Sequence, residues 1–552
     1  MEIDRVLLLK RWVALKSERS SWIYHWKEIS DNLLPRSGRF FIQDRDRGNR
    51  RHNNIQDSTG TRALRILAAG MMSGMTSPAR PWFRLATSDL ELMKSEPVKV
   101  WLNEATTIIL TIFQRSNIYR MLHSLYEELG AFGTGAAIIV PDFENVIHAY
   151  PLTVGEYAIA TNWKGEVTTL YREFQKSVHE VVSEFGYENC SGTVQAMYDV
   201  GNLDSWVTII HAVEPREDRD PSKRDSKNMP WRSIYFELVG DHRTFLRESG
   251  FQRFPAVCPR WSVSGGDIYG NCPGQEALGD IKQLQHEQIR KSEGIDYETA
   301  PPIVVPSSLK NRDVDMLPKG ITYADIVGDK NAIRPLFQVN RNLEHLRMDI
   351  NEVQARINAT FYADMFLMVA EADKSMTATE VAERHEEKML MLGPVIERLQ
   401  NELLDPLVET TFNYAMEAGI LPPPPDELQG HELNIELVSM LAQAQRAIAN
   451  NSIDRFVVGM FGLAQGKPGV LDNLDEDNWA RIYSESLGID PSLMRPKDEV
   501  AAMRQQRAEQ AAAQQQAAMM QQAADSAAKL GTVKTAEPNA LTDVMRQFSG
   551  YG

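Results

Sequence analysis

Cysteine is scarce in this chain, with three residues among 552, and no two of them form a C-x-x-C pair. That number is too small for a disulfide framework, so a reducing cytosol is the expected place of synthesis. We expect Cys190, Cys258 and Cys272 to be small buried hydrophobic residues. No run of about 18 uncharged apolar residues occurs, and charges interrupt the apolar N-terminus, so we expect neither a signal peptide nor a membrane span.

Local motifs for metal, phosphate or nucleophile chemistry are also missing. No two of the 11 histidines lie within five residues of each other, which removes the H-E-x-x-H zinc motif. The segment GLAQGKPG at 462–469 has three residues between its glycines where Walker A has four, and a proline follows Lys467. G-x-S-x-G is absent, and GTGAAIIVP at 133–141 reads as a helix end followed by a strand, the reverse of a dinucleotide turn. We therefore predict no catalytic site, no metal and no cofactor, although carboxylates from distant segments could still converge.

The charge balance is acidic, with 75 acidic and 59 basic residues and a net charge of −16. Such a surface does not favour wrapping nucleic acid, but it permits DNA to pass through a channel. One basic stretch stands out at 36–51, where six arginines alternate with phenylalanines and aspartates. Its composition suits a phosphate-contacting arm, and equally a solvated loop or a subunit-contact loop.

Hydrophobic periodicity predicts helices in the first part of the chain and strands after them. A chain of this length, 43% hydrophobic, is expected to form two to four structural units. We predict helices over 2–33, from Asp57 or Ser58 onward, over 96–116 and over 118–131. A mostly β region follows from 136 to about 262, with one helix near 177–185. The first half is therefore expected to be an α+β unit.

The second half reads mainly as helix. Two long helices, 275–297 and 340–368, flank a β-like insertion at 298–339. A further helical track restarts at Thr377, which forms an S/T-x-x-E capping box with Glu380, and Gly393-Pro394 and Pro406 should divide it before Gly419. Residues 432–488 are predicted helical. The Ala/Gln-rich segment 497–528 is expected to be either unstructured or a helix packed against copies of itself.

Four segments, taken in order, resemble the portal (head-to-tail connector) proteins of short-tailed tailed bacteriophages. They are NNIQDSTGTRALRILAAGMMSGMTSPARPWFRL at 53–85, GDIYGNCPGQEALGDIKQL at 266–284, APPIVVP at 300–306 and MTATEVAERHEEKMLMLGPVIERLQNELLDPLV at 376–408. The resemblance spans most of residues 1–420. At Tyr269–Pro273 this chain reads YGNCP where the family usually reads close to YGRGP or YGRSP, so the family's arginine is missing there.

The resemblance implies an α+β, mainly α, portal fold that assembles into a ring of about twelve copies. Its parts would be an α/β wing at 1–265, a first stem helix at 266–297, a small α/β clip at 298–339, a second stem helix at 340–368, a tunnel loop at 369–377, a kinked wing or tunnel helix at 378–420, a helical crown at 421–496, and a tail at 497–552 that forms a helical barrel or is disordered.

The resemblance also implies a function. The ring would sit at one capsid vertex, at the head-tail junction of the virion, after synthesis in the host cytoplasm. It would carry double-stranded DNA during packaging, retention and ejection, and would contact the major capsid and scaffolding proteins, terminase, and the tail adaptor or other tail proteins. Alternatives are another phage structural protein, such as a tail adaptor or an internal ejection protein, or a DNA-packaging enzyme. The absence of Walker A counts against the enzyme.

Candidate functional residues follow from the same layout. In the tunnel loop, Lys374 would face DNA phosphate while nearby acidic residues limit adhesion, although the segment could equally be an ordinary exposed turn. The tunnel-loop candidates are Glu371, Asp373, Lys374 and Ser375. Possible channel or interface charges on the stem are Lys282, Arg290, Lys291, Arg347 and Arg356. The candidate docking bases of the clip are Lys310, Arg312 and Lys319.

Overall fold

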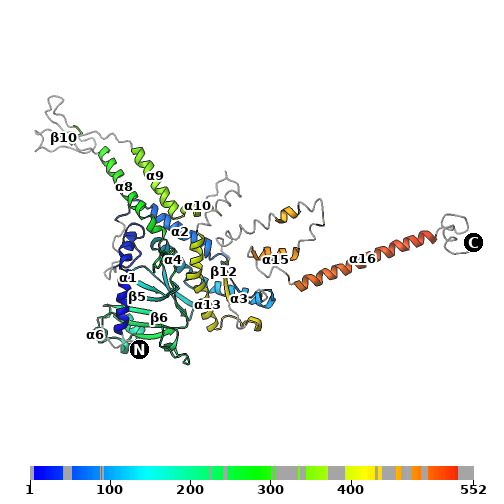
Figure 1. The fold of residues 1–552 in the computed structure, drawn as a ribbon, viewed down its shortest axis with the longest axis horizontal. Helices are drawn as coiled ribbons and strands as arrows, with labels where there is room; N and C mark the ends of the chain where they lie inside the picture. The colour runs from blue at the N-terminus through cyan, green and yellow to red at the C-terminus, as the bar shows by residue number, and fades with distance from the viewer. Residues whose placement is uncertain are drawn as a thin grey trace, which may run out of the picture.

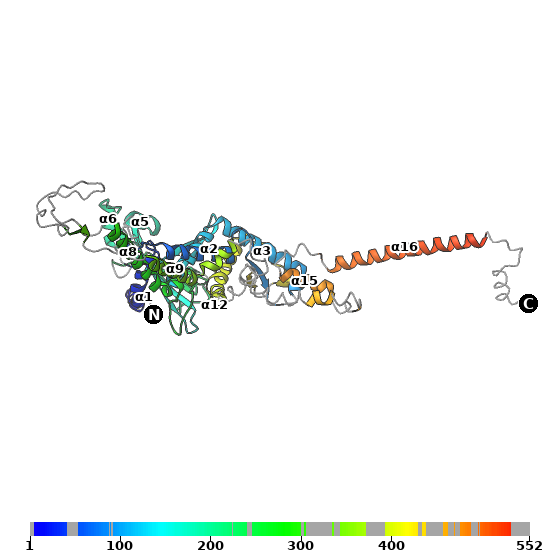
Figure 2. The ribbon, with the colours of Figure 1, turned by 90° about the horizontal axis from the view of Figure 1, so that it is seen from above.

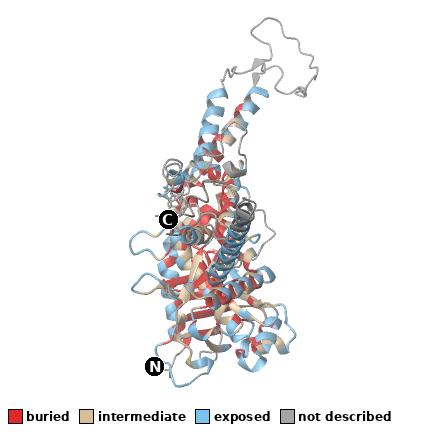
Figure 3. Cartoon of the chain, turned by 90° about the vertical axis from the view of Figure 1, so that its right-hand side faces the viewer, coloured by how far each residue is buried: buried red, intermediate tan, exposed pale blue. Residues whose placement is uncertain are grey.

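The computed structural model describes the following parts of the chain: 5–40, 53–87, 89, 92–223, 225–239, 245–299, 303–304, 334–335, 343–370, 392–428, 433–437, 456–461, 469, 475–486, 495 and 497–531. They form a mixed structure of helix and sheet that is mainly helical, as predicted. Two helices project from one end of the body, and a single long helix extends away from it elsewhere (Figure 1). Buried residues gather in the body, whereas the outer parts of the projecting helices are mostly exposed (Figure 3).

The N-terminal helices lie where the periodicity places them. They are α1 (Arg5–Asn32), α2 (Thr59–Met75), α3 (Glu96–Arg115) and α4 (Ile118–Phe132), with a short 3₁₀ turn η1 (Leu92–Lys94) before α3. Helix α4 ends at Gly133, whose φ of +80° is left-handed backbone that glycine adopts without steric cost. The predicted change from helix to strand after this glycine is confirmed.

A five-stranded antiparallel sheet forms the largest β element, in the order β4-β5-β6-β7-β8. Its strands are β4 (Tyr157–Thr161), β5 (Val167–Ser177), β6 (Trp206–Pro215), β7 (Trp231–Glu237) and β8 (Arg247–Phe251). Side chains alternate between its two faces: Ile210 packs with Leu8 and Trp12 of α1, whereas Ile209 packs with Val181 of helix α5 (Val178–Phe185). The sheet is therefore covered by a helix on each face.

Smaller sheets complete the first half. Strand β2 (Ala136–Asp142) lies between β3 (Val146–Leu152) and β9 (Ala256–Val257). The predictions for this region missed helix α6 (Gly192–Asp199), strand β8 and the short 3₁₀ turns η2 (Tyr187–Asn189) and η3 (Ser226–Asn228). Cys190, Cys258 and Cys272 are all buried and free, as expected.

The two projecting helices are α8 (Leu278–Thr299), preceded by the short α7 (Pro273–Glu276), and α9 (Leu343–Thr360). Between them the structure describes one short antiparallel pair, β10 (Ile303–Val304) with β11 (Arg334–Pro335). The prediction of an unbroken helix to residue 368 is wrong. Helix α9 stops at Thr360, Tyr362 takes a φ of +55°, and α10 (Ala363–Ala370) begins immediately afterwards.

The predicted division of the next helical track is confirmed. Helix α12 (Gly393–Leu399), a π-helical turn η6 (Gln400–Leu404) and α13 (Asp405–Glu417) follow one another, with a proline near the start of both α12 and α13. Proline suits the first turn of a helix, because the amide hydrogen that it lacks has no partner within the helix there. The wider π turn lies immediately before the second of these prolines.

The C-terminal part departs from its helical prediction at Leu433–Leu437. This segment is strand β12, which pairs antiparallel with β1 (Phe83–Thr87), after the 3₁₀ turn η7 (Asp426–Leu428). Its residues alternate between apolar and polar, which is the period of a strand. Helices resume at 456–461 and in α15 (Glu476–Ser486), and α16 (Lys497–Gly531) runs for 35 residues away from the body (Figure 2).

Candidate channel and subunit-contact site

Helices α8 and α9 lie side by side and run in opposite directions (Figures 1 and 3). Arg356 of α9 fixes their register, because its guanidinium donates to the Asp280 carboxylate at 3.1 Å and to the Gln283 side-chain oxygen at 3.5 Å. A second ion pair joins Arg356 to Glu352 within α9 at 3.2 Å. This predicted channel base is therefore occupied with holding the helix pair together.

A carboxylate and three glutamines lock the inner part of this pair to the start of α2. The Asp57 carboxylate accepts hydrogen bonds from the Gln288 amide of α8 and the Gln354 amide of α9, each at 2.9 Å. It also accepts from the amide of Thr59, the first residue of α2, at 2.8 Å. Gln285 completes the junction by accepting from the Asp57 amide at 2.8 Å and donating to the Asp57 carbonyl at 2.9 Å. One aspartate thus connects three helices.

The ionised form of Asp57 is favoured at this junction. Burial alone would raise the pKa of Asp57, but the hydrogen bonds from Thr59, Gln354 and Gln288 together lower this pKa below its usual value. The sequence predicted a helix capped near Asp57 or Ser58. The N-cap position is Ser58, whose side chain makes no capping hydrogen bond, and the bond to the first helical amide comes from Asp57. The bonds of Asp57 to Gln288 and Gln354 were not predictable, because these glutamines lie more than 200 residues away in sequence.

The remaining predicted stem bases fall into two groups. Lys282 pairs with Glu28 of α1 at 2.5 Å, and Arg290 pairs with Glu293 of its own helix at 2.8 Å. Lys291, which is half-buried, and Arg347, which is exposed, have no charged partner among the described residues. Two bases of the predicted five are therefore available for contacts outside the chain.

Lys291 and Arg347 lie at nearly the same level of the helix pair. From the contact between Gln283 and Arg356, Lys291 is eight residues outward along α8 and Arg347 is nine residues outward along α9. At 1.5 Å per residue, these steps correspond to about 12 and 14 Å. These two unpaired bases at one level of the helix pair are called the band of Lys291 and Arg347.

Three predicted sets lie outside the described residues. These are the tunnel-loop residues Glu371, Asp373, Lys374 and Ser375, the clip bases Lys310, Arg312 and Lys319, and the capping box of Thr377 and Glu380.

The helices that flank the predicted tunnel loop pack on α2. The ring of Phe366 in α10 lies where a side chain on Gly70 of α2 would be, so only glycine fits there without displacing the ring. A cavity of about 10 Å³ adjoins this contact. Its lining is entirely apolar: Met71, Met75, Phe366, Leu392, Val395, Ile396 and Leu399. A void of this size holds about one water molecule and no substrate.

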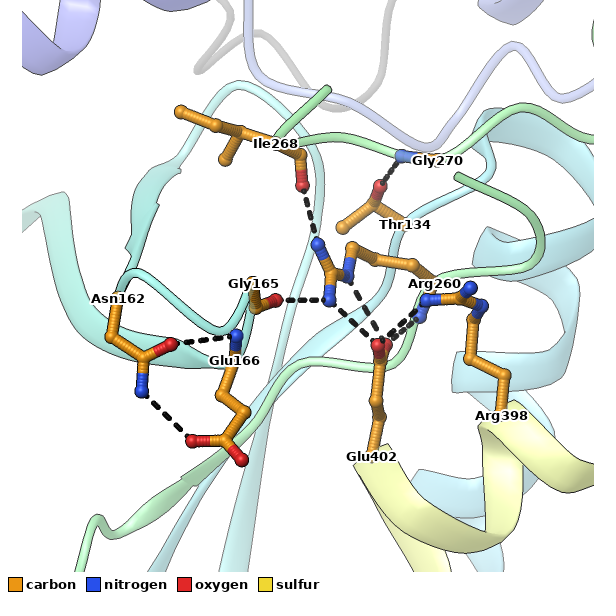
Figure 4. A network of polar contacts seen from close by, with 9 residues as sticks. All are labelled: Thr134, Asn162, Gly165, Glu166, Arg260, Ile268, Gly270, Arg398 and Glu402. Carbon is orange, nitrogen blue, oxygen red and sulfur yellow. Dashed lines mark hydrogen bonds and ion pairs between the residues drawn. The ribbon is translucent and has the colours of Figure 1, made fainter. Parts of the chain in front are cut away.

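A buried ion pair joins the sheets to the π turn (Figure 4). Arg260, which is 3% exposed, donates from its guanidinium to the Glu402 carboxylate at 2.6 and 3.2 Å, and from its backbone amide at 2.9 Å. The same guanidinium donates to the carbonyls of Gly165 at 2.8 Å and Ile268 at 3.4 Å. Arg398 adds an ion pair to Glu402 at 3.2 Å. No local motif in the sequence indicated this network.

Comparison with known proteins decides the family. Residues 5–494 match the model of a family described as "Bacteriophage head to tail connecting protein". The chain belongs to this head-to-tail connector family. The resemblance to portal proteins inferred from four sequence segments is thereby confirmed.

Two relatives of this connector match along almost their whole length. The "Probable portal protein" of Bordetella phage BPP-1 is 60% identical over 551 residues, which covers 100% of this chain and 99% of the relative. The "Portal protein" of Salmonella phage epsilon15 is 44% identical over 546 residues, or 98% of each chain. Portal proteins are structural connector proteins, in agreement with the prediction that this chain is not an enzyme.

Solved structures also match the connector, at low similarity. A chain from the neck of an empty gene transfer agent particle is 12% identical with a TM-score of 0.32, over 78% of this chain and 90% of that one. A chain from the neck of the native particle is 12% identical with a TM-score of 0.33, over 75% and 89%.

The described part of the connector contains no group of three or more His, Cys, Asp or Glu side chains placed to hold a metal ion. Among its helices, none combines the length and apolar character that a membrane span requires.

Proposed function

We propose that this connector is a phage portal protein that forms a ring of about twelve copies at one capsid vertex. The ring carries double-stranded DNA during packaging, retention and ejection, and it binds terminase and the tail. It contacts the major capsid and scaffolding proteins. The observation that carries the proposal is the match to the "Probable portal protein" of phage BPP-1, because identity of 60% extends over 551 residues and covers 99% of that relative.

The structure supports this proposal with a projecting helix pair that suits a channel wall. Helices α8 and α9 are anchored at their inner end by Asp57 and would form the stem, while 298–339 forms the clip at their outer end. Residues 1–265 with 378–420 form the wing, and most of 421–496 forms the crown. Strand β12 pairs with β1, so we place Leu433–Leu437 with the wing.

A channel must surround DNA without gripping it. DNA carries about one charge per 1.7 Å, and binding that neutralises six to ten phosphates depends steeply on salt and would resist movement. An acidic chain with 75 acidic and 59 basic residues keeps most of the wall repulsive. We infer that the band of Lys291 and Arg347, repeated around the ring, supplies weak contacts to DNA at one level of the stem.

The tunnel loop was predicted at 369–377, but α10 continues to Ala370. The loop that follows this helix is proposed to narrow the channel, with Lys374 facing phosphate and Glu371 and Asp373 limiting adhesion. Ser375 completes the loop, and the capping box that begins at Thr377 restarts the helix. The test is to purify Lys374→Ala rings and to measure packaging and retention of DNA. Unchanged behaviour in both assays would reject this role.

Helix α16 is proposed to form a helical barrel with its copies around the channel axis. It spans 35 residues, or about 53 Å, and its described side chains at 504–522 are all exposed. An isolated Ala/Gln helix has little surface to bury, so packing against copies supplies the missing contacts. Truncation after Arg495 should leave ring assembly intact and remove density at one end of the channel.

Docking of terminase and tail proteins is proposed for the clip, with Lys310, Arg312 and Lys319 as its bases. Reversing all three charges should reduce terminase binding without affecting ring formation. Binding to terminase at the wild-type level would reject this assignment.

Complementation tests the function as a whole. A phage that lacks its portal is supplied with this chain or with an inactive control, and DNA-filled heads are counted. The proposal predicts filled heads only with the chain present. Purified chain should also show no ATP hydrolysis and no DNA cleavage, since either activity would favour a packaging enzyme.

A further inference from the structure

The carboxylate of Asp57 uses each of its two oxygen atoms twice. Its Oδ1 accepts from the Thr59 backbone amide at 2.8 Å and from the Thr59 hydroxyl at 2.5 Å. Its Oδ2 accepts from the side-chain amides of Gln288 and Gln354, each at 2.9 Å. An ionised carboxylate offers about four acceptor positions, so this one is fully occupied. One oxygen therefore serves α2, and the other serves both α8 and α9.

Helix α8 has a second set of bonds at this level that do not involve the Asp57 carboxylate. The Gln285 side-chain oxygen accepts from the backbone amides of Gln56 and Asp57 at 2.6 and 2.8 Å, and its amide donates to the Asp57 carbonyl at 2.9 Å. Among the described residues, Gln354 makes the only hydrogen bond from α9 to residues 53–57. Loss of the carboxylate would leave α8 bonded to this segment and α9 without a bond to it.

The Asp57 junction is also the second polar link between α8 and α9. Arg356 of α9 provides the first, to side chains of α8, but two rods that meet at one contact can still pivot about it. Among the side chains that the structure describes, the junction is the outermost polar link between the two helices. Further outward the buried Ile350 packs by apolar contact, which is not directional. The angle of the outer part of α9 therefore depends on Asp57.

We propose that Asp57 is a positioning residue of the channel wall, whose carboxylate sets the angle of α9 and thereby the place of Arg347. The inference rests on the proposed portal function, because it treats the helix pair as the wall of a channel. Arg347 lies seven residues outward from Gln354, about 11 Å along the helix. A pivot of about 10° at Gln354 would move the Arg347 backbone by about 2 Å, which is enough to break a hydrogen bond to phosphate.

The hydrogen bonds at Asp57 predict different outcomes for two substitutions. Asparagine keeps one acceptor oxygen, which can face Thr59, and its amide supplies two donors for the glutamines. Gln288 and Gln354 have no other hydrogen bond among the described residues, so each can turn its amide over and accept without losing a partner. Asp57→Asn should therefore preserve the junction, whereas Asp57→Ala removes it.

The first test measures distances between spin labels by electron paramagnetic resonance. Ser21→Cys on α1 is combined with His345→Cys on α9 or with Asp296→Cys on α8; all three positions are exposed. The three native cysteines are buried and should not take the label. Labelled chains are measured before assembly, and again in rings after dilution among unlabelled copies.

We expect only the α9 distance to respond to loss of the carboxylate. His345 lies nine residues outward from Gln354, so in Asp57→Ala the distance from Ser21 to His345 should shift or broaden by about 2 Å or more. The distance from Ser21 to Asp296 should stay as in wild type. Gln354→Ala removes the same bond from α9 without touching α2 and should reproduce the shift, and Asp57→Asn should match wild type.

A second test follows DNA binding by rings of the unlabelled variants. Asp57→Ala should reduce the slope of log K against log salt by about 1, because one phosphate contact per chain is displaced with Arg347. Asp57→Asn should keep the wild-type slope. An α9 that moves while the slope stays unchanged would overturn the role of Asp57 in placing Arg347.

Three other results would overturn the proposal. They are unchanged α9 distances in both Asp57→Ala and Gln354→Ala, equal shifts of α8 and α9, and an Asp57→Asn chain that behaves like Asp57→Ala. Failure of the wild-type chain to form closed rings would instead reject the proposed portal function. The distances in the unassembled chain can still be measured in that case, so the two failures are distinguishable.

Discussion

Arg260 and Glu402 form an ion pair at 2.6 Å across 142 residues of sequence, and it is one of the contacts that join the β-sheets to the helices after the predicted tunnel loop. Water cannot take the place of Glu402 as a partner of the Arg260 guanidinium, because Arg260 is almost fully buried. Removing one partner of such a pair leaves an uncompensated buried charge, which costs about 3–5 kcal/mol.

Glu402→Gln is therefore expected to lower the free energy of unfolding by several kcal/mol, measured by guanidinium denaturation at one fixed protein concentration. Glu409→Gln is the matched control on α13. Glu409 pairs with Arg253, but both side chains of that pair are about half exposed, at 53% and 51%. The control should lose less than about 1 kcal/mol. Equal effects of the two substitutions would show that the Arg260 network contributes no more than a surface pair.

Glu128 predicts a dependence of stability on pH near neutrality. Burial raises the pKa of Glu128 from 4.5 to about 7, although hydrogen bonds from Thr153 and Val154 lower it in part. Between these values the folded state binds more protons than the unfolded state. The contribution of Glu128 to stability is thus fully present below about pH 4.5 and is lost as pH rises through 7.

The measurement is the unfolding free energy of wild type and Glu128→Gln at pH 5.5 and pH 8. These two pH values lie on either side of most of the titration of Glu128 in the folded chain. Between these values wild type should lose about 1–3 kcal/mol more than the variant. Comparing the change in unfolding free energy between the two pH values cancels any destabilisation by the substitution that does not depend on pH. Parallel pH profiles would mean that Glu128 titrates normally in the folded chain.

Two glycines at the base of the projecting helices predict opposite effects of the same substitution. A methyl group on Gly274 would overlap the backbone of Ala131 in α4, whereas one on Gly279 in α8 would meet nothing within 4 Å. Gly274→Ala should destabilise the chain by about 1–3 kcal/mol or more, because backbone cannot move aside easily. Gly279→Ala should stabilise it by up to about 1 kcal/mol through helix propensity. Thermal unfolding of the two variants checks both predictions. Changes in stability of the same sign in the two variants would contradict the packing described.

The band of Lys291 and Arg347 predicts the salt dependence of DNA binding by assembled rings. Replacing both bases with alanine should reduce the slope of log K against log salt by about 2 or more, since each phosphate contact contributes nearly one. Lys282→Ala is the control, because that ammonium already pairs with Glu28. An unchanged slope in the double variant would remove these bases from the DNA-contacting surface.

Elements with a strong local signal were predictable from the sequence. The glycine at 133 and the prolines at 394 and 406 mark helix boundaries through their own backbone limits, and the helices α3 and α4 follow from apolar spacing. The break at Tyr362 was not predictable, because a left-handed aromatic residue is unfavourable locally and is imposed by the surrounding packing.

Contacts between residues distant in sequence account for the other differences between the predictions and the structure. Strand β12 was read as helix because the partner that stabilises it, β1, precedes it by about 350 residues. The Asp57 junction and the Arg260–Glu402 pair likewise join residues that are distant in sequence. None of these residues belongs to a local motif, so their contacts could not be predicted from the sequence. Sequence therefore indicated the two projecting helices, but not what holds them to the body.

Imaging of the purified chain by electron microscopy tests the central claim most directly. A portal predicts closed rings of about twelve copies with a central hole that admits duplex DNA, and with α8 and α9 as paired rods around it. Monomers, open filaments or closed particles without a hole, at concentrations where the protein is folded, would contradict the account.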